Sequence, residues 1–169
     1  DKNPSYGFLI KLKRVGKNGK PIMVYKLRTM RPFSEYLQEY VFQQNDLADG
    51  GKIKDDFRIS RHGAFFRKYW IDELPMLYNL LKGDVKIVGV RPLSAHYFSL
   101  YDIELQMLRV KTKPGLIPPF YFDLPKTLDE IIASEKKYIR AHAIAPLKTD
   151  LKYFYHAIVN IFFKGSRSR

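Results

Sequence analysis

The chain has 169 residues, enough for one domain with a substantial hydrophobic core. Hydrophobic residues make up 46% and charged residues 28%, which excludes a disordered composition, and the absence of cysteine excludes disulfides and thiolate metal sites. Because 30 Lys and Arg stand against 17 Asp and Glu, the formal net charge is +13, and the surface favours partners that carry phosphate.

Aromatic residues are abundant at 15%, and they are mixed with the basic residues. This mixture suits a membrane interface, where rings lie among headgroups, and it equally suits single-stranded nucleic acid, where bases stack on rings. No apolar run reaches the roughly 20 residues that span a bilayer. Because the chain begins at Asp1 rather than Met, we expect it to be a fragment that lacks an upstream membrane segment.

The first predicted element is a β-hairpin, with strands at residues 6–14 and 21–27 and a turn at 16–19. Lys26 and Arg28 end its second strand. Since they are two residues apart, they point to the same face and are candidates to hold a phosphate. The alternative is a solvated basic edge that prevents further strand pairing.

Residues 34–45 are predicted to form a helix capped by Ser34, and 45–54 a long polar loop. The basic residues that lead from this loop toward an acidic pair are Arg58, Arg61, Arg67 and Lys68.

That acidic pair, Asp72 and Glu73, begins what we interpret as a short helix ending at Gly83. Asp72 is placed as the N-cap, where the helix dipole favours a negative charge. Two adjacent anions repel each other, so a site that keeps both ionised needs a metal or basic side chains nearby. The alternative is that the pair only caps the helix. The apolar positions of this helix are Leu74, Leu77, Tyr78 and Leu81.

In the second half of the chain, residues 86–89 read as a short buried strand that presents Arg91 at its end. Helices are predicted at 97–110 and 127–141, the latter from a capping box. A last helix is predicted from Thr149 or Asp150 to Gly165. Its wide aromatic face suits an interfacial helix, although a core helix with a basic tail is the alternative.

Four ordered blocks resemble one family. Residues 24–30 resemble its Lys-x-Arg-Thr-Met block, 71–75 its Leu-Asp-Glu-Leu-Pro core, 88–92 its Val-Gly-Pro-Arg-Pro segment and 113–115 its Lys-Pro-Gly turn. Together they are similar to the bacterial sugar transferases, the monotopic polyprenyl-phosphate phosphoglycosyl transferases.

The resemblance implies transfer of a sugar-1-phosphate from a UDP-sugar to polyprenyl phosphate, with release of UMP. It implies Asp72 as the nucleophile, Glu73 as its partner, and Mg²⁺ held by both. Lys26, Arg67 and Arg91 match the family's charged positions. With Arg28, they are our candidates for binding substrate phosphates.

The expected fold is α+β, a single catalytic domain over residues 1–169 with helices around a small antiparallel sheet and amphipathic helices along the membrane. The resemblance implies an anionic membrane surface as partner, at the cytoplasmic face of the bacterial inner membrane, and no nucleic acid. A basic nucleic-acid-binding module and a catalytically silent scaffold are the alternatives. The sequence departs from the family at Trp70, Met76, Val90 and residues 116–121, segments that could shape the sugar pocket.

Overall fold

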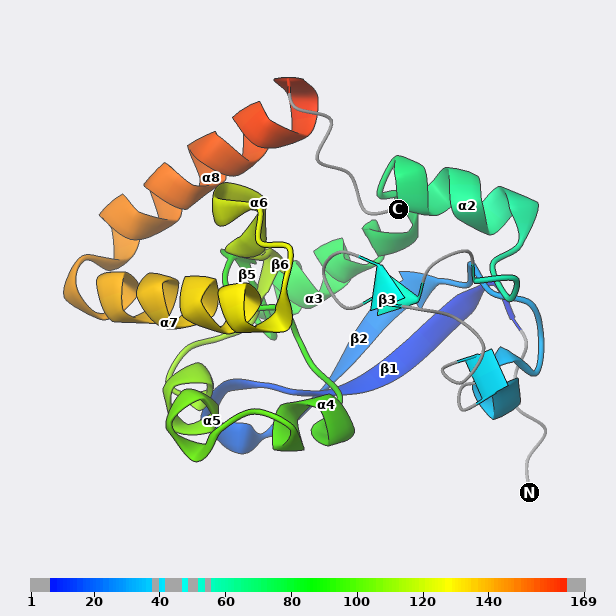
Figure 1. Cartoon of the computed structure of the whole chain (residues 1–169), viewed down its shortest axis with the longest axis horizontal. Coiled ribbons are helices and arrows are strands. Elements are labelled where there is room, and N and C mark those ends of the chain that lie inside the picture. The colour runs from blue at the N-terminus through cyan, green and yellow to red at the C-terminus, as the bar shows by residue number, and fades with distance from the viewer. Residues whose placement is uncertain (1–6, 38–39, 42–46, 49–51, 54–55, 164–169) are drawn as a thin grey trace.

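The computed structural model describes residues 7–37, 40–41, 47–48, 52–53 and 56–163. It is an α+β molecule (Figure 1). Short 3-10 helices lie at Lys17–Gly19, Ser34–Leu37 and Ile71–Glu73. The strands and helices are β1 (Leu9–Val15), β2 (Pro21–Leu27), β3 (Leu47–Ala48), β4 (Lys52–Ile53), α2 (Arg61–Lys68), α3 (Met76–Lys82), β5 (Lys86–Val88), α4 (Ala95–Ser99), α5 (Ile103–Val110), β6 (Gly115–Ile117), α6 (Phe120–Asp123), α7 (Leu128–Ile144) and α8 (Pro146–Phe163).

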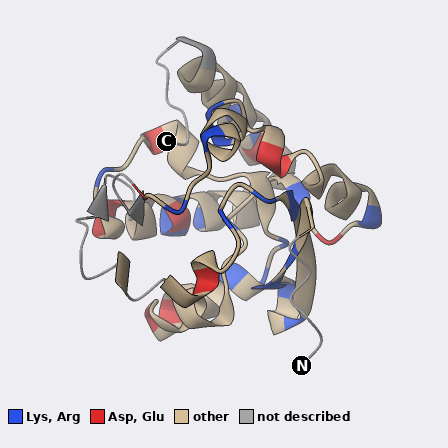
Figure 2. Cartoon of the chain, turned by 90° about the vertical axis from the view of Figure 1, so that its right-hand side faces the viewer, with Lys and Arg blue, Asp and Glu red and all other residues tan. Residues whose placement is uncertain are grey.

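The predicted hairpin is confirmed. β1 and β2 pair antiparallel, with Leu9 opposite Leu27 and Val15 opposite Pro21. Figure 1 shows it as a long ribbon, with α5 beside its turn and α2 near its open end. Lys and Arg recur along its strands (Figure 2).

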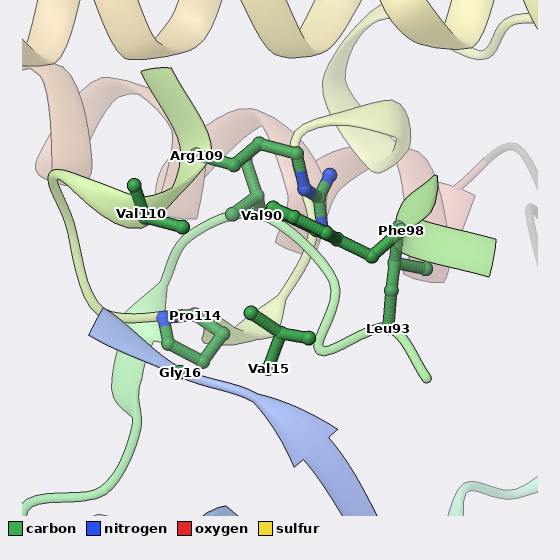
Figure 3. Close-up of a pocket in the computed structure, with 8 residues that line it drawn as sticks. All are labelled: Val15, Gly16, Val90, Leu93, Phe98, Arg109, Val110 and Pro114. Carbon is green, nitrogen blue, oxygen red and sulfur yellow. The ribbon is translucent and has the colours of Figure 1, made fainter. Parts of the chain in front are cut away.

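The turn end of the hairpin packs tightly against the loop that follows β5. The backbone N–H of Val15 donates to the carbonyl of Leu93 at 2.9 Å. The apolar side chains between them enclose a cavity of about 10 Å³, room for one water at most (Figure 3). The hairpin therefore fixes the segment that carries Arg91.

The prediction of one small antiparallel sheet was incomplete. β3 and β4 pair antiparallel within the segment predicted as a loop, and β5 pairs parallel with β6, a strand that was not predicted. Next to this strand pair the two backbones approach so closely that a Cβ on Gly115 would lie 2.0 Å from the nitrogen of Gly89. Only a residue without a side chain permits so close a backbone approach.

Most of the predicted helices were placed correctly, with shifted ends. Thr127 caps α7 as expected, but the helix continues to Ile144, and α8 begins at Pro146 rather than at Thr149 or Asp150. Proline is favoured at a first helical position because its missing N–H has no partner there. The buried cluster on which α7 and α8 pack is Val88, Val90, Leu105, Tyr138, Ile139 and Tyr153.

Two helix predictions were wrong in detail. Residues 97–110 form α4 and α5 rather than one helix, because the carboxylate of Asp102 accepts from the N–H of Leu105 at 2.8 Å and starts a new helix. In the helix predicted for residues 34–45, Ser34–Leu37 form a 3-10 turn and residues 40 and 41 are helical, while the rest lies outside the described residues. α2 was not predicted. Within the described part of the chain, no helix is both long and apolar enough to cross a bilayer.

Candidate active site

Asp72 and Glu73 lie in a separate turn that precedes α3 in the chain. The prediction that Asp72 caps this helix was wrong: residues 71–73 form a 3-10 helix, and α3 begins at Met76 after Pro75. Trp70, directly before the turn, has φ 58° and ψ 17°. A non-glycine residue pays about 1–2 kcal/mol for this left-handed conformation. The left-handed conformation of Trp70 changes the direction of the chain after α2, and the turn that follows carries the two carboxylates.

Glu73 binds a side chain from a distant part of the chain. Its Oε1 forms an ion pair with the Nζ of Lys26 at the end of β2, 47 residues earlier. Both side chains are partly exposed. A phosphate that approaches this pair would therefore meet an ammonium group already held in place.

Asn79 joins α3 to the hairpin. Its side chain is fully buried. Its Oδ1 accepts from the N–H of Tyr25 at 3.0 Å, and its Nδ2 donates to the carbonyl of Met23 at 2.7 Å. These two backbone groups lie on the edge of β2 away from β1. The Asn79 amide therefore supplies the hydrogen-bond partners that a neighbouring strand would otherwise supply. We call these two hydrogen bonds the clamp. The clamp fixes α3, and the Asp72 turn that precedes it, against the strand that carries Lys26.

We therefore expect Asn79→Leu to lower the free energy of unfolding by about 3 kcal/mol, because two backbone groups lose their partners in a buried place. Urea denaturation measures the change. The control is Leu77→Ala on the exposed side of α3, where a change within about 0.5 kcal/mol is expected. Equal stability of the two variants would contradict the clamp.

Arg67 comes from α2, which Ser60 caps by accepting from the N–H of Gly63 at 2.9 Å. Gly63 lies so close to β2's continuation that a Cβ there would be 1.9 Å from the carbonyl oxygen of Thr29. This close packing lets the Nε of Arg67 donate to the Oγ1 of Thr29 at 2.9 Å. Burial lowers the pKa of Arg67, the charge of Asp72 opposes that effect, and the charge of Arg91 adds to it. Arg67 thus lies within electrostatic range of both residues.

Arg91 follows β5 and is exposed. Its carbonyl accepts from an Nη2 of Arg109, whose Nη1 is paired with the carboxylate of Glu135. Both Arg109 and Glu135 are buried. Burial raises the pKa of Glu135, and the Arg109 guanidinium opposes that rise. A buried charge pair therefore supports the backbone that carries Arg91.

Tyr121, a residue not singled out from the sequence, lies at the same place. Its ring packs edge to face on Trp70, with centroids 5.0 Å apart. Burial raises the pKa of its hydroxyl, as do the charges of Glu73 and, less strongly, Asp72, while Arg91 lowers it. The signal in the sequence was the departure from the family pattern at residues 116–121.

The pKa of Asp72 is raised above its ordinary value. Burial is the main cause and the neighbouring charge of Glu73 the second, while Lys26 and Arg67 lower it. The Asp72 carboxylate is thus partly buried, and the positive charges of Lys26 from β2 and Arg67 from α2 stabilise its ionised form. Such an anion is poorly solvated, which makes it a better nucleophile than a carboxylate in open water.

Of the predicted phosphate ligands, Lys26 pairs with Glu73 and Arg67 lies within electrostatic range of Asp72, while Arg91 lies within electrostatic range of Arg67 and Tyr121. Arg28 differs: its Nε donates to the carbonyl of Gly7 at 3.0 Å, at the start of the hairpin. Arg58, read as part of a basic approach, is buried and holds Asp56 with two bonds of 2.7 and 2.8 Å. Sequence spacing alone does not predict these partners of Arg28 and Arg58.

The sequence of the chain is similar to those of known proteins. A family model described as bacterial sugar transferase matches residues 3–164. A galactosyl transferase, CpsE, of Streptococcus agalactiae serotype III is 36% identical over 135 residues, which cover 78% of this chain and 30% of that protein. An undecaprenyl-phosphate galactose phosphotransferase of Salmonella typhimurium is 36% identical over 110 residues, 61% of this chain and 22% of that protein.

A UDP-glucose:undecaprenyl-phosphate glucose-1-phosphate transferase of Klebsiella pneumoniae is likewise 36% identical, over 61% of this chain and 20% of its own length. The chain thus spans less than half the length of the curated relatives it matches here. The family match covers nearly every residue and includes the Asp72 turn, β2 and the Arg91 segment. The chain therefore belongs to the bacterial sugar transferase family.

Proposed function

We propose that this chain transfers a sugar-1-phosphate from a UDP-sugar to polyprenyl phosphate and releases UMP. The observation that carries the proposal is that Lys26 and Arg67, from separate parts of the chain, meet the Asp72–Glu73 pair, with Arg91 acting on Arg67 and on Tyr121. The names of the Salmonella and Klebsiella relatives, which specify undecaprenyl phosphate, support it. Residues 1–169 would form one catalytic domain.

In the first step, a carboxylate oxygen of Asp72 attacks the phosphorus that carries the sugar. A new oxygen–phosphorus bond forms, the bond from this phosphorus to the bridging oxygen breaks, and UMP leaves with the electron pair. Arg67 and Arg91 would neutralise the charge that develops on the phosphoryl oxygens. Ionised Asp72 is required, so the surrounding cations act by opposing the rise in its pKa.

In the second step, a phosphate oxygen of the polyprenyl acceptor attacks the same phosphorus. The bond to Asp72 breaks and its carboxylate is regenerated. The product is a polyprenyl diphosphate sugar. Because donor and acceptor phosphates occupy the same cationic site in turn, the same Lys26 and Arg67 serve both steps.

We further propose that Asp72 and Glu73 hold Mg²⁺ together with substrate phosphate. Magnesium is commonly bound by one or two carboxylates plus phosphate oxygens, and the adjacent pair fits that donor set. The described residues contain no group of three or more acidic, His or Cys ligands, so a metal held by protein alone is not supported. When bound, the ion would polarise the phosphoryl oxygens and offset their charge.

The acceptor's chain is apolar, and exposed apolar side chains lie on α3, which follows the Asp72 turn, and at the α7–α8 connection. α3 exposes one stripe, with Leu81 87% accessible, and the α7–α8 connection exposes Ile144 and Leu147 to the same extent. The other exposed members are Leu74, Leu77, Tyr78 and Leu151. With a net charge of +13, these faces suit an anionic membrane surface. We propose the cytoplasmic face of the bacterial inner membrane.

The test is a UMP-release assay with a panel of UDP-sugars, polyprenyl phosphate and Mg²⁺ in detergent or vesicles. We expect one donor to be preferred, and we expect chelation by EDTA to reduce the rate at least about 100-fold until Mg²⁺ is restored. Full activity in EDTA would contradict the metal site. Tight, salt-sensitive binding of single-stranded DNA with no UMP release from any donor would favour the nucleic-acid alternative.

A further inference from the structure

A second basic site lies at the turn end of the hairpin. An open pocket of about 460 Å³ is lined by residues of the 3-10 turn, the end of α5, the start of β5 and the last turns of α7. We call it the basic pocket. The basic side chains that line it are Lys17, Lys86, Lys111, Lys113, Arg140 and His142.

Three of these six basic groups already have acidic partners. The Nζ of Lys86 lies 3.0 Å and the Nε2 of His142 lies 3.7 Å from the carboxylate of Asp150, and Arg140 donates to Glu104 at 2.8 Å. The remaining three, Lys17, Lys111 and Lys113, have no carboxylate within 4.0 Å among the residues that the structure describes. Like charges that converge on one cavity repel, and an anion in the cavity would relieve that repulsion.

The C-terminal ends of two nearby helices offset only part of this positive charge. α5 ends beside the pocket at Val110, and Lys113 approaches Gly83 at the end of α3. Each helix C-terminus carries a partial charge of roughly −0.5, so two ends offset about one of the three free lysines. About two positive charges stay without compensation, which matches the charge of a phosphate monoester near neutral pH.

The floor of the pocket is apolar. Its apolar lining residues are Leu108, Ile139 and Ala143. A volume of 460 Å³ falls within the range of small-molecule sites, about 300–1,000 Å³. This combination suits a molecule that joins a phosphate to an apolar or aromatic body, either a nucleotide or a lipid phosphate.

The pocket is separate from the acidic pair. Lys17 lies in the hairpin turn, whereas Lys26 lies near the other end of β2. The five residue steps from Pro21 to Lys26 alone span about 17 Å at the usual rise of a strand. A ligand of the size that fills this cavity therefore does not reach Glu73.

We propose that the basic pocket binds a small phosphate-bearing molecule with an apolar body, at a site distinct from the Asp72–Glu73 pair. Lys17, Lys111 and Lys113 bind the phosphate, and the apolar floor contacts the body. The proposal does not depend on the transferase activity.

Calorimetric titration of the whole chain tests it with AMP, with dihexanoyl phosphatidic acid below its micellar concentration, and with adenosine. We expect at least one phosphate probe to bind, and we expect adenosine to bind at least about 10-fold more weakly than AMP if AMP is bound. The probe that binds distinguishes a nucleotide from a lipid phosphate.

The variant is Lys17→Gln with Lys111→Gln and Lys113→Gln, expected to weaken binding at least about 30-fold. The matched control, Lys13→Gln with Lys126→Gln and Lys148→Gln, removes the same charge from exposed positions and should change affinity less than about 3-fold. If the triple variant does not fold by circular dichroism, Lys111→Gln alone replaces it, with an expected loss of about 5-fold. Absence of binding by both phosphate probes, or equal affinity in pocket and control variants, would overturn the proposal.

Discussion

Asp72→Asn is expected to reduce the rate of UMP release by about 1,000-fold or more while the protein remains folded. The amide cannot form the covalent phosphosugar intermediate, whereas the cations around it are left in place. Single-turnover measurement of UMP from the preferred UDP-sugar gives the rate, and circular dichroism checks the fold. Full activity would rule out Asp72 as the nucleophile.

The same variant should be more stable than the parent at neutral pH. Burial and Glu73 raise the pKa of Asp72 in the folded state, so its ionised form costs folding free energy there. This cost is absent below the unfolded pKa of about 3.9 and develops as pH rises through the raised folded value. Because the side chain is partly exposed, the gain at pH 7 is below about 1 kcal/mol, or at most about 2–4 °C in Tm.

Scanning calorimetry at pH 7 and at pH 3.5 measures this difference, which should vanish at the lower pH. Glu73→Gln is the matched control. It removes one charge from the same turn but also takes the anionic partner from Lys26, so no gain in Tm is expected. A lower Tm for Asp72→Asn at pH 7 would show that the cations outweigh burial at Asp72.

The parts of the fold that sequence predicts well depend on local chemistry. The Gly16–Gly19 turn between two alternating strands gives the hairpin, Thr127 starts α7, and Gly83 ends α3 in the left-handed conformation. In each case the residue that decides the structure lies within a few positions of the element itself.

The parts that sequence misses depend on distant partners. β6 has three residues next to proline, too short for an alternation to be visible, and it is a strand because β5 provides its backbone partners. Trp70 has a left-handed backbone conformation that a bulky side chain does not favour locally. The predicted start of the helix, at Asp72, was therefore misplaced.

The candidate site shows the same division. The adjacent carboxylates and their basic residues are visible as motifs, but their grouping depends on Asn79 and on the Gly63 contact, which are tertiary. Arg28 was grouped with Lys26 from strand spacing, and its Nε donates to the carbonyl of Gly7 at the start of the hairpin. Tyr121 reaches the site only because the segment after β6 folds back over Trp70.

The buried pair of Arg109 and Glu135 leads to the largest expected effect on stability. Arg109→Met should lower the free energy of unfolding by about 3–5 kcal/mol, because it leaves the Glu135 carboxylate buried without its cation. The control is Arg140→Met, which breaks an exposed pair with Glu104 and should leave the unfolding midpoint almost unchanged. Urea denaturation measures both, and equal midpoints would contradict the importance of the buried pair.

The pH dependence of Arg109→Met distinguishes the lost charge pair from lost packing. Burial already raises the pKa of Glu135, and removal of the guanidinium removes the effect that opposed this rise. The carboxyl then binds its proton more tightly when folded than when unfolded, so the stability of the variant falls as pH rises from about 4.3 through the raised pKa. A deficit that shrinks on acidification, and a double variant Arg109→Met with Glu135→Leu that recovers most of the loss, are expected. Since Arg109 also binds the carbonyl of Arg91, the double variant should regain stability but keep a raised KM for the UDP-sugar, because the Arg91 segment has lost its support.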